Sequence, residues 1–192
     1  MILAKLKEAT RAQHEGLEGS VDVMSRMFAL EDYKTLLTKF YRFYAAIEPE
    51  LEKLVWSDVG YDFEERRKLP KLEEDLMNLG LDLVEIKSAA PFSQIPNVDD
   101  FARAFGTLYV LEGATLGGQI IKRHLKEHLG LTPENGGSFF NGYGEQTGMM
   151  WKSFGTVITA FAENGDHDDA IVETAKETFD SFRKCFEQSV TA

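Results

Sequence analysis

Apolar residues recur at helical spacing along almost the whole chain. One amphipathic segment covers residues 2–19, and a second covers residues 30–54, where Pro49 predicts a kink or an interruption. A broken, polar helical region follows over residues 63–80. The sequence has neither the alternating pattern of strands nor an internal repeat. These features predict an all-α protein, folded as a multi-helix bundle.

Two loops divide the second half of the chain. Residues 88–98 contain two prolines, and Asp99 or Asp100 is then suited to cap a long helix. Residues 130–148 are rich in glycine and predict a second connection. Two further helices are expected over residues 147–162 and 168–188. Because the proline loop is short enough to be internal, we expect a single domain over residues 1–192.

The composition is that of an ordinary soluble globular protein, with 43% hydrophobic and 28% charged residues. Cys185 is the only cysteine, which excludes an intrachain disulfide and a cysteine-based zinc site. The net charge of −11 argues against general nucleic-acid binding, which needs a basic surface. The sequence contains no apolar run near the roughly 18 residues that span a bilayer, and no signal-peptide core. We therefore expect a cytoplasmic protein without nucleic-acid or membrane partners.

The stretch LYVLEGATLGGQIIKRHL, residues 108–125, is predicted to be helical but carries Gly113, Gly117 and Gly118 in its middle. Each glycine costs a helix about 1 kcal/mol relative to alanine, so the three together cost roughly 3 kcal/mol. This pattern indicates that one face of the helix must be free of side chains. Close packing of another helix across the spacing of Gly113 and Gly117 is one explanation.

His14 lies near the apolar face of residues 2–19. Glu18, one turn later, can accept a hydrogen bond from the imidazole and fix its orientation, as ligating histidines require. Lys7 precedes His14 by almost two turns, so both side chains point the same way, roughly 10.5 Å apart along the helix axis. From the spacing alone, a satisfied, partly buried histidine and a surface lysine remain the simpler explanation.

Two other histidines, His124 and His128, are four residues apart and share one face of a helix. That spacing can bind zinc, but the sequence adds neither a third ligand nor a Glu-x-x-His pattern. A solvated helix end is the alternative, because cationic residues there suit the helix dipole. His167 lies in the polar turn NGDHDDA, where we expect it to be exposed.

Two motifs, LKEATRAQH and YVLEGATLGGQII, lie about 100 residues apart and resemble those of the haem oxygenases. The resemblance is closest to the bacterial, biliverdin-producing branch associated with bacteriophytochromes, and it extends to FFNGYG, MMWKSFG and AKETFDSFRKCF. It implies an all-α fold in which haem lies between the first helix and the glycine-bearing helix. It also implies that haem is both cofactor and substrate, cleaved with O2 and external electrons to biliverdin, CO and ferrous iron.

The resemblance assigns roles to residues of both motifs. His14 matches the proximal ligand of the haem iron, Lys7 a cation that faces a haem propionate, and Glu18 the carboxylate that hydrogen-bonds the histidine. The glycines match those whose backbone lies over the distal face of the haem, where the reaction takes place: Gly113, Gly117 and Gly118.

Matches outside the two motifs are looser. Lys152 falls where a second propionate-binding lysine is expected, although an ordinary exposed lysine is the alternative. Phe179 and Phe186 match aromatic residues that line the distal pocket, although both could be plain core. Ala114 stands where mammalian-type members have an aspartate that orders distal waters, and Thr156 stands where an arginine is expected at a propionate. These two departures leave the distal water network and the orientation of the haem open.

Few charged groups lie on the predicted distal helix face. Residues 108–121 contain no histidine, arginine or lysine, and Glu112 is their only charge. Peptide groups, ordered water or Thr115 are the candidate hydrogen-bond donors. A protein that stores haem without cleaving it is the alternative function that Ala114 leaves open. A thiaminase-like or di-iron enzyme is a third, although the sequence lacks the Glu-x-x-His pairs of di-iron proteins.

An electron donor is an expected partner, such as a ferredoxin or an NAD(P)H-dependent reductase. Ferredoxins are acidic, as this chain is, so docking would require a local basic face. Lys122, Arg123 and Lys126 are candidates for that face.

Overall fold

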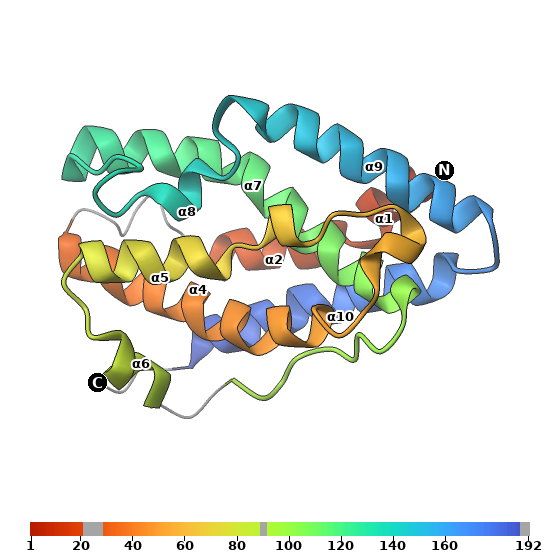
Figure 1. The fold of residues 1–192 in the computed structure, drawn as a ribbon, viewed down its shortest axis with the longest axis horizontal. Coiled ribbons are helices and arrows are strands. Elements are labelled where there is room, and N and C mark those ends of the chain that lie inside the picture. The colour runs from red at the N-terminus through yellow and green to blue at the C-terminus, as the bar shows by residue number, and fades with distance from the viewer. Residues whose placement is uncertain (21–28, 89–91, 189–192) are drawn as a thin grey trace.

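The computed structural model describes residues 1–20, 29–88 and 92–188. Within these ranges the chain forms α-helices and short 3-10 helices, and no strand (Figure 1). The all-α class predicted from the hydrophobic spacing is therefore confirmed.

The elements follow the predicted order. The first half of the chain contains α1 (Ile2–Ala9), α2 (Arg11–Ser20), α4 (Leu30–Leu51), η1 (Trp56–Val59), η2 (Glu64–Arg66), α5 (Leu69–Asn78) and α6 (Leu83–Ser88). The second half contains α7 (Phe101–Leu129), α8 (Ser138–Asn141), η3 (Gly144–Gln146), α9 (Thr147–Glu163) and α10 (Asp168–Glu187). No helix in the described ranges is both long enough and apolar enough to cross a membrane.

The first predicted helix is divided at Thr10 into α1 and α2. The Thr10 hydroxyl donates a 2.8 Å hydrogen bond to the carbonyl oxygen of Leu6, a type of bond that bends helices. An interruption at Pro49, one of the two predicted outcomes, does not occur, because α4 runs through this residue and ends at Leu51. Pro49 lies in the last turn of α4, where little helix remains to be disrupted.

The longest helix, α7, has 29 residues and begins at the cap residue Asp100, whose side chain accepts a hydrogen bond from the backbone N–H of Arg103. In Figure 1, α7 runs through the middle of the molecule, with α9 on one side and α4 and α10 on the other. At the crossing of α7 and α10, a Cβ on Gly106 would lie 2.3 Å from the carbonyl oxygen of Ile171. Only glycine allows so close an approach of two backbones.

Aromatic side chains fill much of the core between α4, α8 and α10. The ring of Phe40 contacts those of Phe139, Phe140, Phe182 and Phe186 at centroid distances between 4.9 and 5.4 Å. Such edge-to-face contacts add to the free energy gained by burial. This cluster forms one border of the cavity that separates α2 from α7.

Candidate functional site

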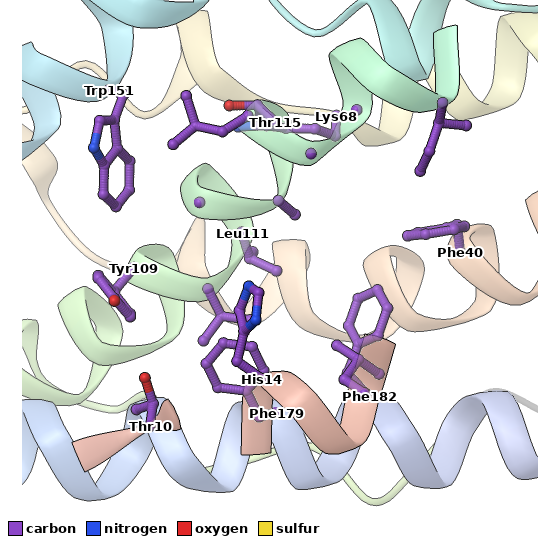
Figure 2. Close-up of a pocket in the computed structure, with 18 of the residues that line it drawn as sticks. Thr10, His14, Phe40, Lys68, Tyr109, Leu111, Thr115, Trp151, Phe179 and Phe182 are labelled. Atoms are coloured by element: carbon purple, nitrogen blue, oxygen red, sulfur yellow. The ribbon is translucent and has the colours of Figure 1, made fainter. Parts of the chain in front are cut away.

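A cavity of about 760 Å³ lies between α2 and the middle of α7, with α10 behind α2 (Figure 2). Its volume is within the range of about 300–1,000 Å³ that is common for small-molecule and cofactor sites. Most of the wall is apolar, including two side chains of α7 that are themselves exposed, Leu116 and Ile120. The remaining large apolar and aromatic residues of the wall are Leu17, Phe40, Tyr44, Tyr109, Val110, Leu111, Ile121, Phe139, Phe140, Trp151, Phe179 and Phe182.

His14 projects from α2 into this cavity, toward α7. The ring of Phe179, on α10, meets the imidazole edge to face at a centroid distance of 5.7 Å. The helix contacts between α2 and α10 thus place an aromatic support next to the imidazole, away from α7. The side chain of Glu18 lies outside the described residues, so its hydrogen bond to His14 stays a prediction.

The three glycines of α7 all line the cavity, but for different reasons. A Cβ on Gly117 would meet no atom of the described residues within 4 Å, so the backbone there faces open cavity. A Cβ on Gly118 would lie 3.0 Å from the carbonyl oxygen of Phe140, so this glycine allows α7 to pack on α8. A Cβ on Gly113 would touch the ring of Trp151 at 3.8 Å. The helix-packing explanation therefore applies to Gly118, whereas Gly117 exposes backbone to the cavity.

Two cations line the cavity near His14. Lys7 is one of them, as the sequence predicted, and it lies on α1. Arg11, at the start of α2, is the other and was missed. Its position, four residues after Lys7 and three before His14, is the helical spacing that could have revealed it. Both side chains are exposed and are suited to bind carboxylate groups at the edge of a ligand.

Two predicted ligand contacts are not at the cavity. Lys152 is exposed and does not line it, because the preceding residue, Trp151, is the one that α9 turns toward the cavity. Successive residues of a helix point about 100° apart, so Lys152 faces away. Phe186 packs in the core against Phe182, with their rings stacked at 4.9 Å, and it is Phe182 that lines the cavity.

Phe179 does line the cavity, but on the side of His14 rather than on the glycine side where it was expected. On the glycine side, Ala114 presents a small apolar surface. The hydroxyl of Thr115 donates a 2.6 Å hydrogen bond to the carbonyl oxygen of Glu112. Its single proton is therefore engaged within the helix, which weakens the prediction that Thr115 donates to a ligand.

A buried ionic cluster lies behind the glycine side and was not predicted. The Glu112 side chain is fully buried and accepts hydrogen bonds from Arg66 at 2.8 Å and from the Tyr143 hydroxyl at 2.7 Å. It also accepts one from the ammonium group of Lys68, a residue that lines the cavity. Burial lowers the pKa of Lys68, while the adjacent carboxylate of Glu112 opposes that shift. The signal in the sequence was the lone charge of Glu112 on an apolar helix, which requires a partner when buried.

The structure does not support zinc binding by the pair His124 and His128. The rings of His124 and His128 lie 4.3 Å apart, but the described residues contain no group of three or more metal-ligating side chains. His124 is buried, so the alternative of a solvated helix end is wrong for this residue, while His128 is exposed. His167 is partly buried rather than exposed, because its ring stacks on that of Phe161 at 4.4 Å.

The fold and the cavity define an all-helical protein that can enclose a large, mostly apolar ligand between a histidine and a glycine-rich helix. The family model for heme oxygenase matches residues 1–188, so the chain belongs to the haem oxygenase family. This finding confirms the resemblance that the two motifs carried.

Individual relatives agree with the family. A heme oxygenase from Xanthomonas campestris pv. campestris (strain 8004) is 34% identical over 97 residues, which are 50% of this chain and 54% of the relative. The chain thus spans about half the length of the curated relative that it matches. The heme oxygenase from Neisseria meningitidis, solved with NO and CO bound, shares the fold with a TM-score of 0.80 at 20% identity, covering 100% of this chain and 95% of that one. The heme oxygenase from Leptospira interrogans does so with a TM-score of 0.73 at 21% identity, covering 96% and 98%.

Proposed function

We propose that the protein binds haem in this cavity and cleaves it to biliverdin, CO and ferrous iron, using O2 and electrons from an external donor. The observation that carries the proposal is the placement of His14 and Gly117 on opposite walls of one apolar cavity. Membership of the haem oxygenase family supports the same function.

The cavity contains residues suited to each part of haem: the iron, the porphyrin ring and the propionates. A neutral imidazole at His14 suits the iron, and the apolar wall suits the porphyrin. Lys7 and Arg11, on the His14 side, suit the propionates, and the bare backbone at Gly117 admits a flat ring close to α7. When bound, haem supplies the iron that activates O2 and the carbon skeleton that is oxidised.

The chain's own residues would hold the haem and restrict what can reach it. His14 binds the iron, and Phe179 limits the movement of the imidazole by packing against its ring. The aromatic residues Phe40, Phe182 and Trp151 exclude bulk water from the wall. On the glycine side, α7 offers backbone, Ala114 and a Thr115 hydroxyl whose proton is already engaged. This wall thus presents no strong proton donor to a ligand from α7.

For the electron donor, we retain the hypothesis of a basic docking face on the second half of α7. Arg123 and Lys126 are exposed there, and Lys122 donates a 2.7 Å hydrogen bond to the side chain of Asn141. An acidic ferredoxin is the chemical class that would complement these cations. Reversing the charges of Arg123 and Lys126 should slow ferredoxin-supported turnover but not turnover with a small chemical reductant; equal rates with both donors would refute the hypothesis.

The experiment that tests the function is a haem titration followed by reduction under air, for the wild type, His14→Ala and His128→Ala. The wild type should bind haem, lose the Soret band on reduction and develop biliverdin absorption. His14→Ala should lose the axial-ligand signature in its spectrum, whereas His128→Ala should behave as the wild type. A Soret band that persists without biliverdin would indicate haem storage, and an unchanged signature in His14→Ala would overturn the assignment of the ligand.

A further inference from the structure

The glycine side of the cavity has a charged neighbour that does not belong to α7. Figure 2 shows Lys68 on the same wall of the cavity as Thr115, opposite His14. Lys68 comes from the segment just before α5, and among the described residues of the ionic cluster it is the member that lines the cavity. Its side chain is buried, with 7% of its surface exposed.

The ammonium group of Lys68 is held by three protein acceptors. It donates to the carbonyl oxygen of Arg66 at 2.6 Å, to the Tyr143 hydroxyl at 2.6 Å and to the carboxylate of Glu112. An ammonium group has three N–H donors, so all of them are engaged. The backbone is fixed as well, because the Lys68 N–H donates to the Glu48 carboxylate at 2.6 Å. These contacts hold the cationic side chain of Lys68 in a fixed position, and its ammonium group has no free N–H to donate to a ligand.

The position of Lys68, rather than the sum of charges around it, places a positive charge at the wall, because Arg66, Glu112 and Glu48 do not line the cavity. Arg66 and Lys68 both pair with the single carboxylate of Glu112, which leaves one positive charge in excess within this group. The carboxylate of Glu48 lies on the backbone side of Lys68 and balances that charge over the whole region. Charges in a poorly solvated interior interact more strongly than they do in water.

We propose that Lys68 supplies the glycine side of the cavity with a fixed positive charge that stabilises negative charge on a ligand of the haem iron without donating a proton to it. The proposal rests on the proposed function, because it concerns a ligand held opposite His14. It assigns Lys68 an electrostatic role in place of the aspartate that is absent at Ala114. Stabilisation without proton transfer is the property that a site needs when it must keep a reactive anion intact.

The test compares ferric azide binding and the infrared stretch of bound CO in the haem complexes of four proteins. These are the wild type, Lys68→Met, Lys68→Arg and the matched control Lys71→Met. Lys71 lies on α5, next to the same tyrosine ring, and donates to the carbonyl oxygen of Gly142, but it does not line the cavity. Lys68→Met should fold because Arg66 and Glu112 remain a balanced pair. If Lys68→Met does not fold, Lys68→Gln provides a second neutral variant. Circular dichroism checks the folding of each variant.

Loss of one positive charge near the ligand should weaken azide binding by about tenfold in Lys68→Met and raise the CO stretching frequency. Lys68→Arg and Lys71→Met should stay close to the wild type in both measurements. The proposal is overturned if Lys68→Met matches the wild type, or if Lys71→Met loses as much azide affinity. A wild type that takes up no haem would instead refute the proposed function, and the role of Lys68 with it.

Discussion

Two glycines of α7 should respond in opposite ways to the same substitution. A Cβ on Gly117 meets nothing within 4 Å among the described residues, whereas a Cβ on Gly106 would lie 2.3 Å from the carbonyl oxygen of Ile171. Alanine in a helix interior is about 1 kcal/mol more favourable than glycine. Gly117→Ala should therefore raise the unfolding free energy of the haem-free protein by nearly that amount. For a chain of this size, that gain corresponds to roughly 2–4 °C in Tm.

Gly106→Ala gains the same helical preference but forces α7 away from the backbone of α10. Overpacking of this kind typically costs about 1–3 kcal/mol, and a backbone carbonyl cannot move aside as a flexible side chain can. The net effect should be a loss of stability. Thermal and urea unfolding of both variants beside the wild type measures the contrast. A destabilised Gly117→Ala together with an unchanged Gly106→Ala would refute the reasoning.

The same substitution at Gly117 should have a cost in ligand binding. Its methyl group would enter the space next to α7 that we assign to the flat face of haem. Haem affinity, measured by absorbance titration, should therefore fall while the stability of the haem-free protein rises. Unchanged affinity in the stabilised variant would show that the ligand does not contact α7 at this residue.

Three other substitutions test the electrostatics of the fold and the site. Burial raises the pKa of Asp75 to about 6, above that of the unfolded chain. The native state therefore keeps this proton to a higher pH than the unfolded chain does. As the pH rises from about 4 to 6, the free energy of unfolding should fall by up to about 2 kcal/mol. Asp75→Asn should remove this slope from urea titrations, and an identical slope would contradict the assignment. Glu112→Gln leaves two buried cations without their carboxylate and should cost about 3–5 kcal/mol in urea unfolding; a change below 0.5 kcal/mol would contradict the role of the cluster. Lys7→Ala should weaken haem binding several-fold in a titration. Lys5 pairs instead with acidic side chains of α10, so Lys5→Ala should leave haem binding unchanged. Equal effects of the two substitutions would exclude a specific contact by Lys7.

Local spacing was sufficient to predict the helices and part of the site. Hydrophobic periodicity is a property of neighbouring turns, so α7, α9 and α10 could be predicted within a few residues. His14 and Lys7 lie two turns apart along the chain, and the glycines lie within six residues of one another. The glycines are brought together by their spacing in one helix. Lys7 and His14 are close enough in the chain that both line the cavity, although the helix is divided between them at Thr10.

Contacts between distant segments could not be predicted in this way. Lys68 and Glu112 are separated by 44 residues, and their pairing depends on how α5 packs near α7. Phe182 and Phe186 are one turn apart on the same face of α10, so which of them lines the cavity depends on where along its axis α10 passes the cavity. The periodicity does not give that position. The placement of Lys152 depends on the rotation of α9 about its axis, since one step along the helix turns a side chain from the cavity to the surface.

The division of the first helix at Thr10 has a consequence for ligand selection. Lys7 lies on α1, which packs against α9 and α10, whereas His14 lies on α2, which packs against α10. The two residues proposed to bind different parts of one molecule therefore belong to separate helices joined at Thr10. The angle between α1 and α2 at Thr10 sets the distance between His14, the proposed iron ligand, and Lys7, the proposed partner of a propionate. Residues remote from the cavity that alter the angle would change the size of ligand that fits, while leaving every contacting side chain in place.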